Sequence, residues 1–102
     1  MALADPKPPT CKSKILRDSA EGEDCTARSE FCNYNPETVV FCHIRMFGRS
    51  GNSTKPIDIH GFYGCSECHR NEDKIDLADI FRAMMETQEI LYIKGIISVK
   101  GV

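Results

Sequence analysis

The sequence has few of the large aromatic side chains that fill protein cores. Its 102 residues include no tryptophan, five phenylalanines and three tyrosines. Because aromatic side chains bury the largest areas, the hydrophobic core of this protein must be small. A chain of this length forms one domain and buries a modest fraction of its surface, so a bound metal ion would help to hold the fold together.

The sequence also lacks a membrane-spanning segment, a secretory signal and a strong positive charge. No run approaches the roughly 20 apolar residues of a transmembrane helix. Residues 1–10, with Pro6, Pro8 and Pro9, contain no apolar core of the kind that a signal peptide needs. The net charge of -2 argues against indiscriminate binding of polyanions. We therefore expect a cytoplasmic protein with no membrane partner and with reduced thiols.

Four of the six cysteines form two close pairs. Six residues separate Cys25 from Cys32, and two residues separate Cys65 from Cys68. Two close pairs far apart in the sequence are typical of a tetrahedral zinc site that two chain segments share. Four thiolates leave no coordination position open for water, so the zinc is predicted to be structural.

Two other states of these cysteines are compatible with their number. Disulfides would suit a secreted protein, and unpaired thiols would suit a reducing compartment. Zinc is favoured over both because paired cysteines in a cytosolic chain point to a metal site. Cys11 and Cys42 fall outside the two pairs and are predicted to be free thiols.

The first half of the chain contains one predicted helix and one predicted strand. Residues 1–11 are expected to form a disordered tail, and residues 12–20 a short basic helix. The segment 25–32 is typical of a tight metal-binding loop. Residues 38–44 are rich in β-branched and aromatic side chains, which predicts a strand. Residues 45–56 are expected to form a loop because they combine glycine, serine, asparagine and proline.

The second half of the chain changes from strand-like to helical periodicity. Residues 57–63 are compatible with a strand or with a short helical turn. Asp76 is a predicted N-cap, after which apolar side chains recur with helical spacing and are expected to face the core. These side chains are Leu77, Ile80, Phe81 and Met84. Residues 90–99 form a strand-like run, interrupted by Lys94 and Gly95, that predicts a final strand or hairpin.

Two histidines lie next to these features. His43 ends the predicted strand, and His69 directly follows Cys68. The residues alone support a zinc-stabilised domain with two candidate reactive histidines. Each histidine also has a structural interpretation. His43 could be a half-buried strand residue that binds a backbone carbonyl, and His69 could be a polar residue that caps a turn.

The pattern as a whole resembles a known family. It is similar to the small prophage-encoded nuclease family of the YbcO type, within the HNH or ββα-metal superfamily, over roughly residues 14–98. The motifs are specific as a set, whereas a lone Cys-x-x-Cys-His run is a weak signal because many binding zinc fingers contain it. They include the run from Cys65 to His69 and the run from His43 to Arg45. The other matching positions are Arg17, Gly22, Cys25, Arg28, Cys32, Asn35, Pro36, Glu37, Thr38, Gly48, Gly51, Lys55, Asp58, Asp73, Thr87 and Gln88.

The resemblance implies a catalytic role for three side chains. His43 would be the general base that takes a proton from water as the water attacks a DNA phosphodiester. His69 would bind a catalytic divalent cation, Mg²⁺ or another ion, separate from the structural zinc. Asp58 would be a further ligand of that cation, since hard cations prefer carboxylate oxygen, and His60 is the alternative.

The resemblance also implies where nucleic acid would bind. Three basic residues lie between Thr38 and Ile57, a stretch without acidic residues. Phosphate contacts usually come from such side chains. These candidate phosphate-binding residues are Arg45, Arg49 and Lys55.

One position departs from the family pattern. Many HNH nucleases have an acidic residue just before the base histidine, where it helps to bind the metal, and this chain has Cys42 there. A thiol binds Mg²⁺ poorly and Zn²⁺ well. Three explanations are open: Asp58 substitutes as the ligand, the metal site is weak, or a softer ion is bound.

With the resemblance included, the sequence predicts an α+β fold. We expect a small zinc-stapled treble-clef or ββα-metal (HNH-like) domain over residues 12–102, with a C-terminal helix and a strand or hairpin. The expected function is that of a metal-dependent, phage-associated endonuclease or nickase. Its partners would be DNA, branched or single-stranded, and a protein of phage recombination or replication. The alternative is a zinc-binding module for nucleic acid or protein that keeps the HNH frame without cleaving.

Overall fold

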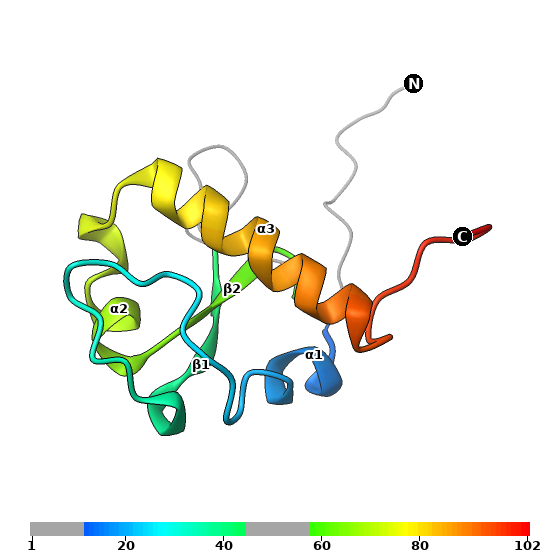
Figure 1. The fold of residues 1–102 in the computed structure, drawn as a ribbon, viewed down its shortest axis with the longest axis horizontal. Coiled ribbons are helices and arrows are strands. Elements are labelled where there is room, and N and C mark those ends of the chain that lie inside the picture. Colours follow the sequence, from blue (N-terminus) through cyan, green and yellow to red (C-terminus); the bar gives the residue numbers. More distant parts are fainter. Residues whose placement is uncertain (1–11, 45–57) are drawn as a thin grey trace, which may run out of the picture.

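The computed structural model describes residues 12–44 and 58–102 (Figure 1). In chain order, these residues form α1 (Lys14–Asp18), η1 (Pro36–Thr38), β1 (Val40–His43), β2 (Gly61–Gly64), α2 (Ser66–Arg70), η2 (Glu72–Lys74) and α3 (Leu77–Ile93). The predicted α+β class is confirmed, since helices surround a two-stranded sheet. The tail predicted at 1–11 and the loop predicted at 45–56 lie outside the described residues.

β1 and β2 form an antiparallel pair at the centre of the domain. Phe41 lies opposite Tyr63, and His43 lies opposite Gly61. The strand predicted over residues 38–44 is confirmed by β1, and the ambiguous segment 57–63 contributes the start of β2. A Cβ atom at position 61 would overlap the Phe41 ring, so the close approach of the two strands needs glycine there.

The backbone N–H and carbonyl groups at the outer edge of β2 form hydrogen bonds with α3 and with the loop that follows α1. The backbone N–H of Tyr63 donates to Thr87 Oγ1 at 3.1 Å, and its carbonyl accepts from the Thr26 N–H at 2.8 Å and the Thr26 hydroxyl at 2.9 Å. The two threonine hydroxyls lie 3.0 Å apart, which closes a buried ring of hydrogen bonds. The backbone groups of this strand edge are therefore paired rather than left unsatisfied.

The C-terminal part of the chain is helical for longer than the sequence predicted. α3 ends in a Schellman motif, in which Gly95 has a φ of 75° and its N–H donates to the Tyr92 carbonyl at 3.0 Å. The next N–H, of Ile96, donates to the Leu91 carbonyl at 2.9 Å. The strand or hairpin predicted over residues 90–99 is therefore wrong. Its first four residues continue the helix, and the glycine that was expected to break a strand ends the helix instead.

The buried face of α3 also differs from the prediction. The N-cap is confirmed, since the Asp76 side chain accepts a backbone N–H of the first turn. Of the apolar residues expected to face the core, Ile80 is half-buried and packs against it, whereas Leu77 and Phe81 are each 57% exposed. The residues that α3 buries fully are Ala83, Thr87 and Leu91. These three residues have helical spacing. Alanine and threonine are weak hydrophobic signals, so the sequence pattern favours the face with Leu77 over the face that is buried in the structure.

α1 closes the other side of the sheet. The helix predicted over residues 12–20 is confirmed in the shorter range Lys14–Asp18, and Ser13 caps it by accepting the Leu16 N–H at 3.1 Å. The Ser19 hydroxyl that follows α1 lies 2.8 Å from the Tyr63 hydroxyl. Among the described residues, every helix is too short or too polar to cross a membrane.

Candidate functional site

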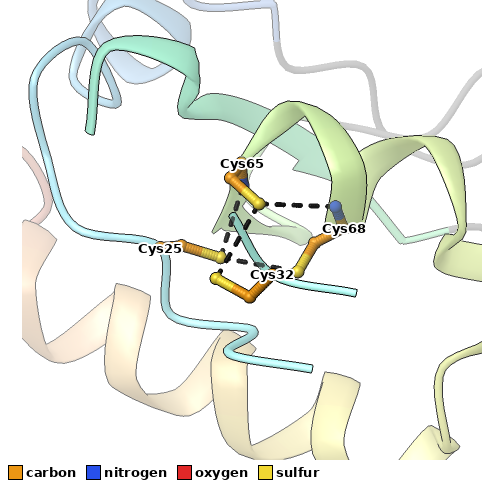
Figure 2. A group of neighbouring side chains, drawn as sticks. All are labelled: Cys25, Cys32, Cys65 and Cys68. Carbon is orange, nitrogen blue, oxygen red and sulfur yellow. Dashed lines mark hydrogen bonds between the residues drawn. The ribbon is translucent and has the colours of Figure 1, made fainter. Parts of the chain in front are cut away.

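The four cysteines predicted as zinc ligands come together at one place (Figure 2). Cys25 and Cys32 belong to the loop between α1 and η1, and Cys65 and Cys68 lie at the start of α2, directly after β2. Cys65 is the N-cap of α2, and its sulfur accepts the Cys68 N–H at 3.4 Å. The short spacing of the second pair therefore places both sulfurs at the first turn of the helix.

The sulfur atoms have the spacing of a tetrahedral metal site. Sγ of Cys25 lies 3.7 Å from Sγ of Cys68, and Sγ of Cys65 lies 3.8 Å from Sγ of Cys32. Two sulfurs bound at roughly 2.3 Å to one tetrahedral centre would be roughly 3.8 Å apart, whereas a disulfide bond measures about 2.05 Å. The arrangement therefore fits one bound metal ion and does not fit disulfides.

Backbone N–H groups point at these sulfurs. The Cys65 sulfur accepts from Asn33 and Cys68, each at 3.4 Å, and the Cys32 sulfur accepts from Tyr34 at 3.3 Å. Burial opposes ionisation of Cys65, but the hydrogen bonds from Asn33 and Cys68 lower its pKa to about 7. Because the thiolate is the form that binds metal, these hydrogen bonds favour the metal-binding form of Cys65. Burial has the opposite effect on two of its neighbours, since it raises the pKa of Cys68 and raises that of Cys32 to about 12.

His43 makes a close contact with Asp58 at the end of β1. Its Nε2 atom lies 2.8 Å from Asp58 Oδ1. The Asp58 side chain is 8% exposed, accepts the backbone N–H of Ser13, and lies 3.5 Å from Arg17 Nε. An ionised carboxylate can only accept, so the imidazole donates its Nε2 proton to Asp58, and Nδ1 is the ring nitrogen left for other partners.

Asp58 is held in its charged form. Burial would raise the pKa of this carboxyl, but the hydrogen bonds from the Ser13 N–H and from His43, with the charge of Arg17, bring its pKa below the usual value. An ionised carboxylate at this position fixes the orientation of the imidazole.

His69 belongs to a second group of side chains. The Cys42 sulfur, one His69 ring nitrogen and one Glu72 carboxylate oxygen all lie within 4.8 Å of one another, and His69 Nδ1 is 3.7 Å from Glu72 Oε2. Cys42 is fully buried, and burial raises the pKa of its thiol. A thiol, an imidazole and a carboxylate form a ligand set for a transition metal rather than for Mg²⁺.

The two histidines face different sides of the hairpin. The His43 ring makes an edge contact with the Phe41 ring, with centroids 5.6 Å apart, so these alternate residues share one face of β1. Cys42 points to the other face, where a Cβ atom on Gly64 would lie 2.8 Å from its sulfur. The structure therefore brings Asp58 to His43, and it brings His69 to Cys42 and Glu72.

The other predicted site residues divide into two sets. His60, the alternative to Asp58, contributes its backbone carbonyl, which accepts the Ile44 N–H at 2.9 Å and extends the hairpin. Its neighbour Asp58 is the residue whose side chain contacts His43. The predicted phosphate-binding residues lie outside the described residues; they are Arg45, Arg49 and Lys55.

Three site residues were missed at the level of sequence. Glu72 could have been found, because it follows His69 by three residues and so shares a side of a helical turn. Ser13 and Arg17 act on Asp58 across more than forty residues of sequence. Their contacts depend on the packing of α1 against β1, for which the sequence carried no signal.

Comparison with known proteins assigns the chain to a family. The sequence model of the family described as "Putative nuclease YbcO" matches residues 14–95. A protein of Escherichia coli K12 named "Putative nuclease YbcO" and one of Enterobacteria phage 82 named "Putative nuclease ybcO" are each 47% identical to this chain over 62 residues. Each match covers 60% of this chain and 62% of the relative, so the chain spans less than two thirds of these relatives' length.

A solved structure extends the likeness to three dimensions. It is titled as that of a putative bacteriophage protein from Escherichia coli K-12 MG1655 and is 32% identical in sequence. It superimposes with a TM-score of 0.63 over 79% of this chain and 100% of its own. The first two relatives include a bacterial and a phage protein, which agrees with the predicted prophage association. This chain therefore belongs to the family described as "Putative nuclease YbcO", the name that both curated relatives also carry.

Proposed function

We propose that Cys25, Cys32, Cys65 and Cys68 bind a structural zinc ion. The proposal rests on the donor set, since four cysteine sulfurs at tetrahedral spacing suit zinc and close its coordination sphere. The ion would join the loop after α1 to the start of α2. In a domain with so small a core, zinc binding would contribute a large part of the folding free energy.

The function that the site supports best is hydrolysis of DNA phosphodiester bonds by an HNH-type endonuclease or nickase. The contact between His43 Nε2 and Asp58 Oδ1, at 2.8 Å, carries this proposal. It leaves Nδ1 as the basic nitrogen of a partly exposed ring, in a chain whose family is described as "Putative nuclease YbcO". The order hairpin, cysteine pair and helix also agrees with a ββα-metal or treble-clef frame.

The proposed mechanism assigns different work to the two residues of this pair. His43 Nδ1 takes a proton from the water that attacks phosphorus, and the proton later leaves to solvent or to the departing oxygen. Asp58 is a positioning residue in this assignment and not the metal ligand that the resemblance implied. Its two oxygens already contact His43, Ser13 and Arg17.

We assign the second metal site to Cys42, His69 and Glu72. When bound there, a divalent cation stabilises negative charge on the phosphate and on the leaving oxygen. The thiol donor favours a softer ion such as Zn²⁺ or Ni²⁺ over Mg²⁺. Cys42 then stands where many HNH nucleases carry an acidic ligand, and Glu72 supplies the carboxylate from η2.

The DNA would meet the end of β1. Arg45 directly follows β1 and Ile44, and Arg49 and Lys55 come soon after it in the sequence. Because the net charge is -2, DNA binding should be weak. The affinity should fall further as salt is added, in proportion to the small number of phosphates that the protein neutralises. A branched or single-stranded substrate, or a protein partner from phage recombination or replication, would add the missing affinity.

Plasmid nicking tests this proposal. Supercoiled plasmid and single-stranded DNA are incubated with wild type, His43→Ala and His60→Ala, without added metal and with Mg²⁺, Mn²⁺, Ni²⁺ or Zn²⁺. We expect metal-stimulated cleavage by wild type and by His60→Ala, and none by His43→Ala that retains its zinc. Equal cleavage by all three proteins would point to a contaminant or to a different base.

One observation favours the second candidate function, a zinc-binding interaction module without nuclease activity. Cys42 and His43 point to opposite faces of β1, so a phosphate would have to lie at the end of the strand to reach both groups. A module would keep the cysteine site and bind DNA or protein. It is the preferred interpretation if folded wild type cleaves under none of these conditions yet binds DNA.

A further inference from the structure

A hollow beside the cysteine site has no role in the function proposed above. It encloses about 270 Å³ and is lined by Asp24, Cys25, Arg28, Tyr34 and Pro36. Drug-sized ligands occupy pockets of roughly 300–1,000 Å³, so this hollow suits something smaller, such as one aromatic heterocycle. Its wall is chemically mixed, with a carboxylate, a guanidinium, an aromatic ring and a proline.

The backbone around the hollow is strained at two points. Among the described residues, Arg28 and Tyr34 are the non-glycine residues with positive φ, at 42° and 55°. This conformation is unfavourable for residues that carry a Cβ atom. Both strained residues line the same hollow. Such strain persists where the surroundings impose it, and it is concentrated at ligand-binding positions.

Ion pairs and hydrogen bonds from α3 hold one side of the hollow. The Arg28 guanidinium makes a two-pronged contact with Glu86, at 2.8 and 3.0 Å. Arg82 donates to the carbonyls of Thr26 and Ala27 at 2.9 and 2.8 Å, which fixes the backbone just before Arg28. The guanidinium is therefore placed before any ligand binds, and within residues 12–44 and 58–102 its remaining N–H groups have no hydrogen-bond acceptor.

The metal site holds the other side. The Tyr34 N–H donates to the Cys32 sulfur at 3.3 Å, so the backbone of Tyr34 is tied to a metal ligand. Asn35 is fixed in turn, since its N–H donates to Asn33 Oδ1 at 2.8 Å. The Tyr34 side chain itself is 70% exposed. A large aromatic residue is thus held rigidly while its side chain faces solvent.

We propose that this hollow binds one unpaired nucleobase of a single-stranded nucleic acid, with guanine preferred; this rests on the proposed function and names its substrate class. The Tyr34 ring stacks on the base, as aromatic side chains do in single-strand binding proteins. Arg28 donates to the O6 and N7 acceptors of guanine. Asp24 accepts from the amino edge of the same base, and a base paired in a duplex could not offer that edge.

Binding of mononucleotides tests the site apart from cleavage, because a mononucleotide contains no internal phosphodiester. The zinc-loaded protein is titrated with dGMP, dAMP, dCMP and dTMP and followed by ¹H–¹⁵N NMR. We expect saturable shifts at Arg28 and Tyr34, strongest with dGMP. Tyr34→Ala should weaken binding about tenfold, and Asp24→Asn should reduce the preference for guanine. Tyr92→Ala, at another exposed tyrosine, is the matched control.

The outcomes separate this inference from the nuclease proposal. A thymidine oligonucleotide with one central guanine should bind more tightly than dGMP and more tightly than its duplex, which would identify a strand as the source of the base. Two results would overturn the inference even if the protein cleaves DNA. One is that no nucleotide produces saturable shifts at Arg28 and Tyr34. The other is that zinc-loaded Tyr92→Ala and Tyr34→Ala lose nucleotide affinity equally. Retained binding in a protein that does not cleave would support the hollow and contradict the nuclease proposal.

Discussion

Replacement of Thr87 by valine tests how α3 is attached to the sheet. Thr87 is fully buried, accepts the Tyr63 N–H at 3.1 Å and lies 3.0 Å from the Thr26 hydroxyl. Valine has nearly the shape of threonine, so Thr87→Val creates no cavity. It leaves the Tyr63 N–H buried without an acceptor and removes a hydrogen bond to Thr26.

The size of the effect follows from these contacts. A buried donor without a partner costs about 1–3 kcal/mol, and a lost neutral hydrogen bond costs about 1 kcal/mol. Thr87→Val should therefore lower the free energy of unfolding by about 2–4 kcal/mol. Thr87→Ser keeps the ring of hydrogen bonds and loses one methyl group, which should cost about 1 kcal/mol.

Urea unfolding followed by circular dichroism at 222 nm, at a fixed excess of free zinc, measures both changes. The comparison is decisive because hydrophobicity alone predicts the opposite order, with valine better than serine in a buried position. If Thr87→Val is as stable as wild type while Thr87→Ser is weaker, the ring of hydrogen bonds does not fasten α3 to β2.

Other variants test the metal site, the buried carboxylate and the buried face of α3. Cys65→Ala should lose its zinc and unfold, and a folded Cys65→Ala with full metal content by atomic emission would refute the site. Because the pKa of Asp58 is lowered on folding, its contribution to stability is present above about pH 4 and is lost as the pH falls further. The difference in unfolding free energy between wild type and Asp58→Asn should therefore shrink in acid, and a pH-independent difference would contradict this. Leu91→Ala should lower the free energy of unfolding by about 2–4 kcal/mol, whereas Leu77→Ala should lower it by less than about 0.5 kcal/mol. Equal decreases in urea unfolding would show that Leu77 contributes to the core as much as Leu91 does.

The cysteine site was predictable because it depends on the short sequence spacing within each cysteine pair. Two close pairs predict that the four sulfurs meet at one place suited to a metal ion, whatever the path of the chain between them. The N-cap Asp76 was predictable for the same reason, since one side chain and the adjacent turn decide it. His43 was marked as a candidate by its place at the end of a strand and by the family resemblance.

The buried face of α3 was not predictable in this way. Ala83 and Thr87 pack against the hairpin because a small side chain and a hydroxyl fit there, and hydrophobicity is a poor guide to either. Leu77 and Phe81 have the periodicity of a core and are nevertheless exposed. Tertiary packing, which the pattern does not contain, selects among the possible faces of the helix.

The partner of His43 was also beyond the sequence. Both His43 and Asp58 were expected in the site, but as a base and a metal ligand rather than as a contacting pair. The contact depends on the hairpin register and on Ser13, which donates to Asp58 from the N-cap of α1. Similarly, the sequence marks Cys42 only as a departure from the family pattern, whereas the structure places it beside His69 and Glu72 as a third potential metal ligand.

The most direct test of the account is the rate of DNA cleavage by Asp58→Asn at neutral pH beside wild type. Both proteins would have the same zinc content and the same circular dichroism spectrum, so that a difference in rate reflects the contacts of the Asp58 carboxylate with His43 and Arg17 and not a loss of the fold. If His43 is the base and Asp58 positions it, Asp58→Asn should cleave at least about tenfold more slowly, since general bases contribute roughly 10²–10⁴-fold. Cleavage by Asp58→Asn at the wild-type rate would show that the pair is not the catalytic centre.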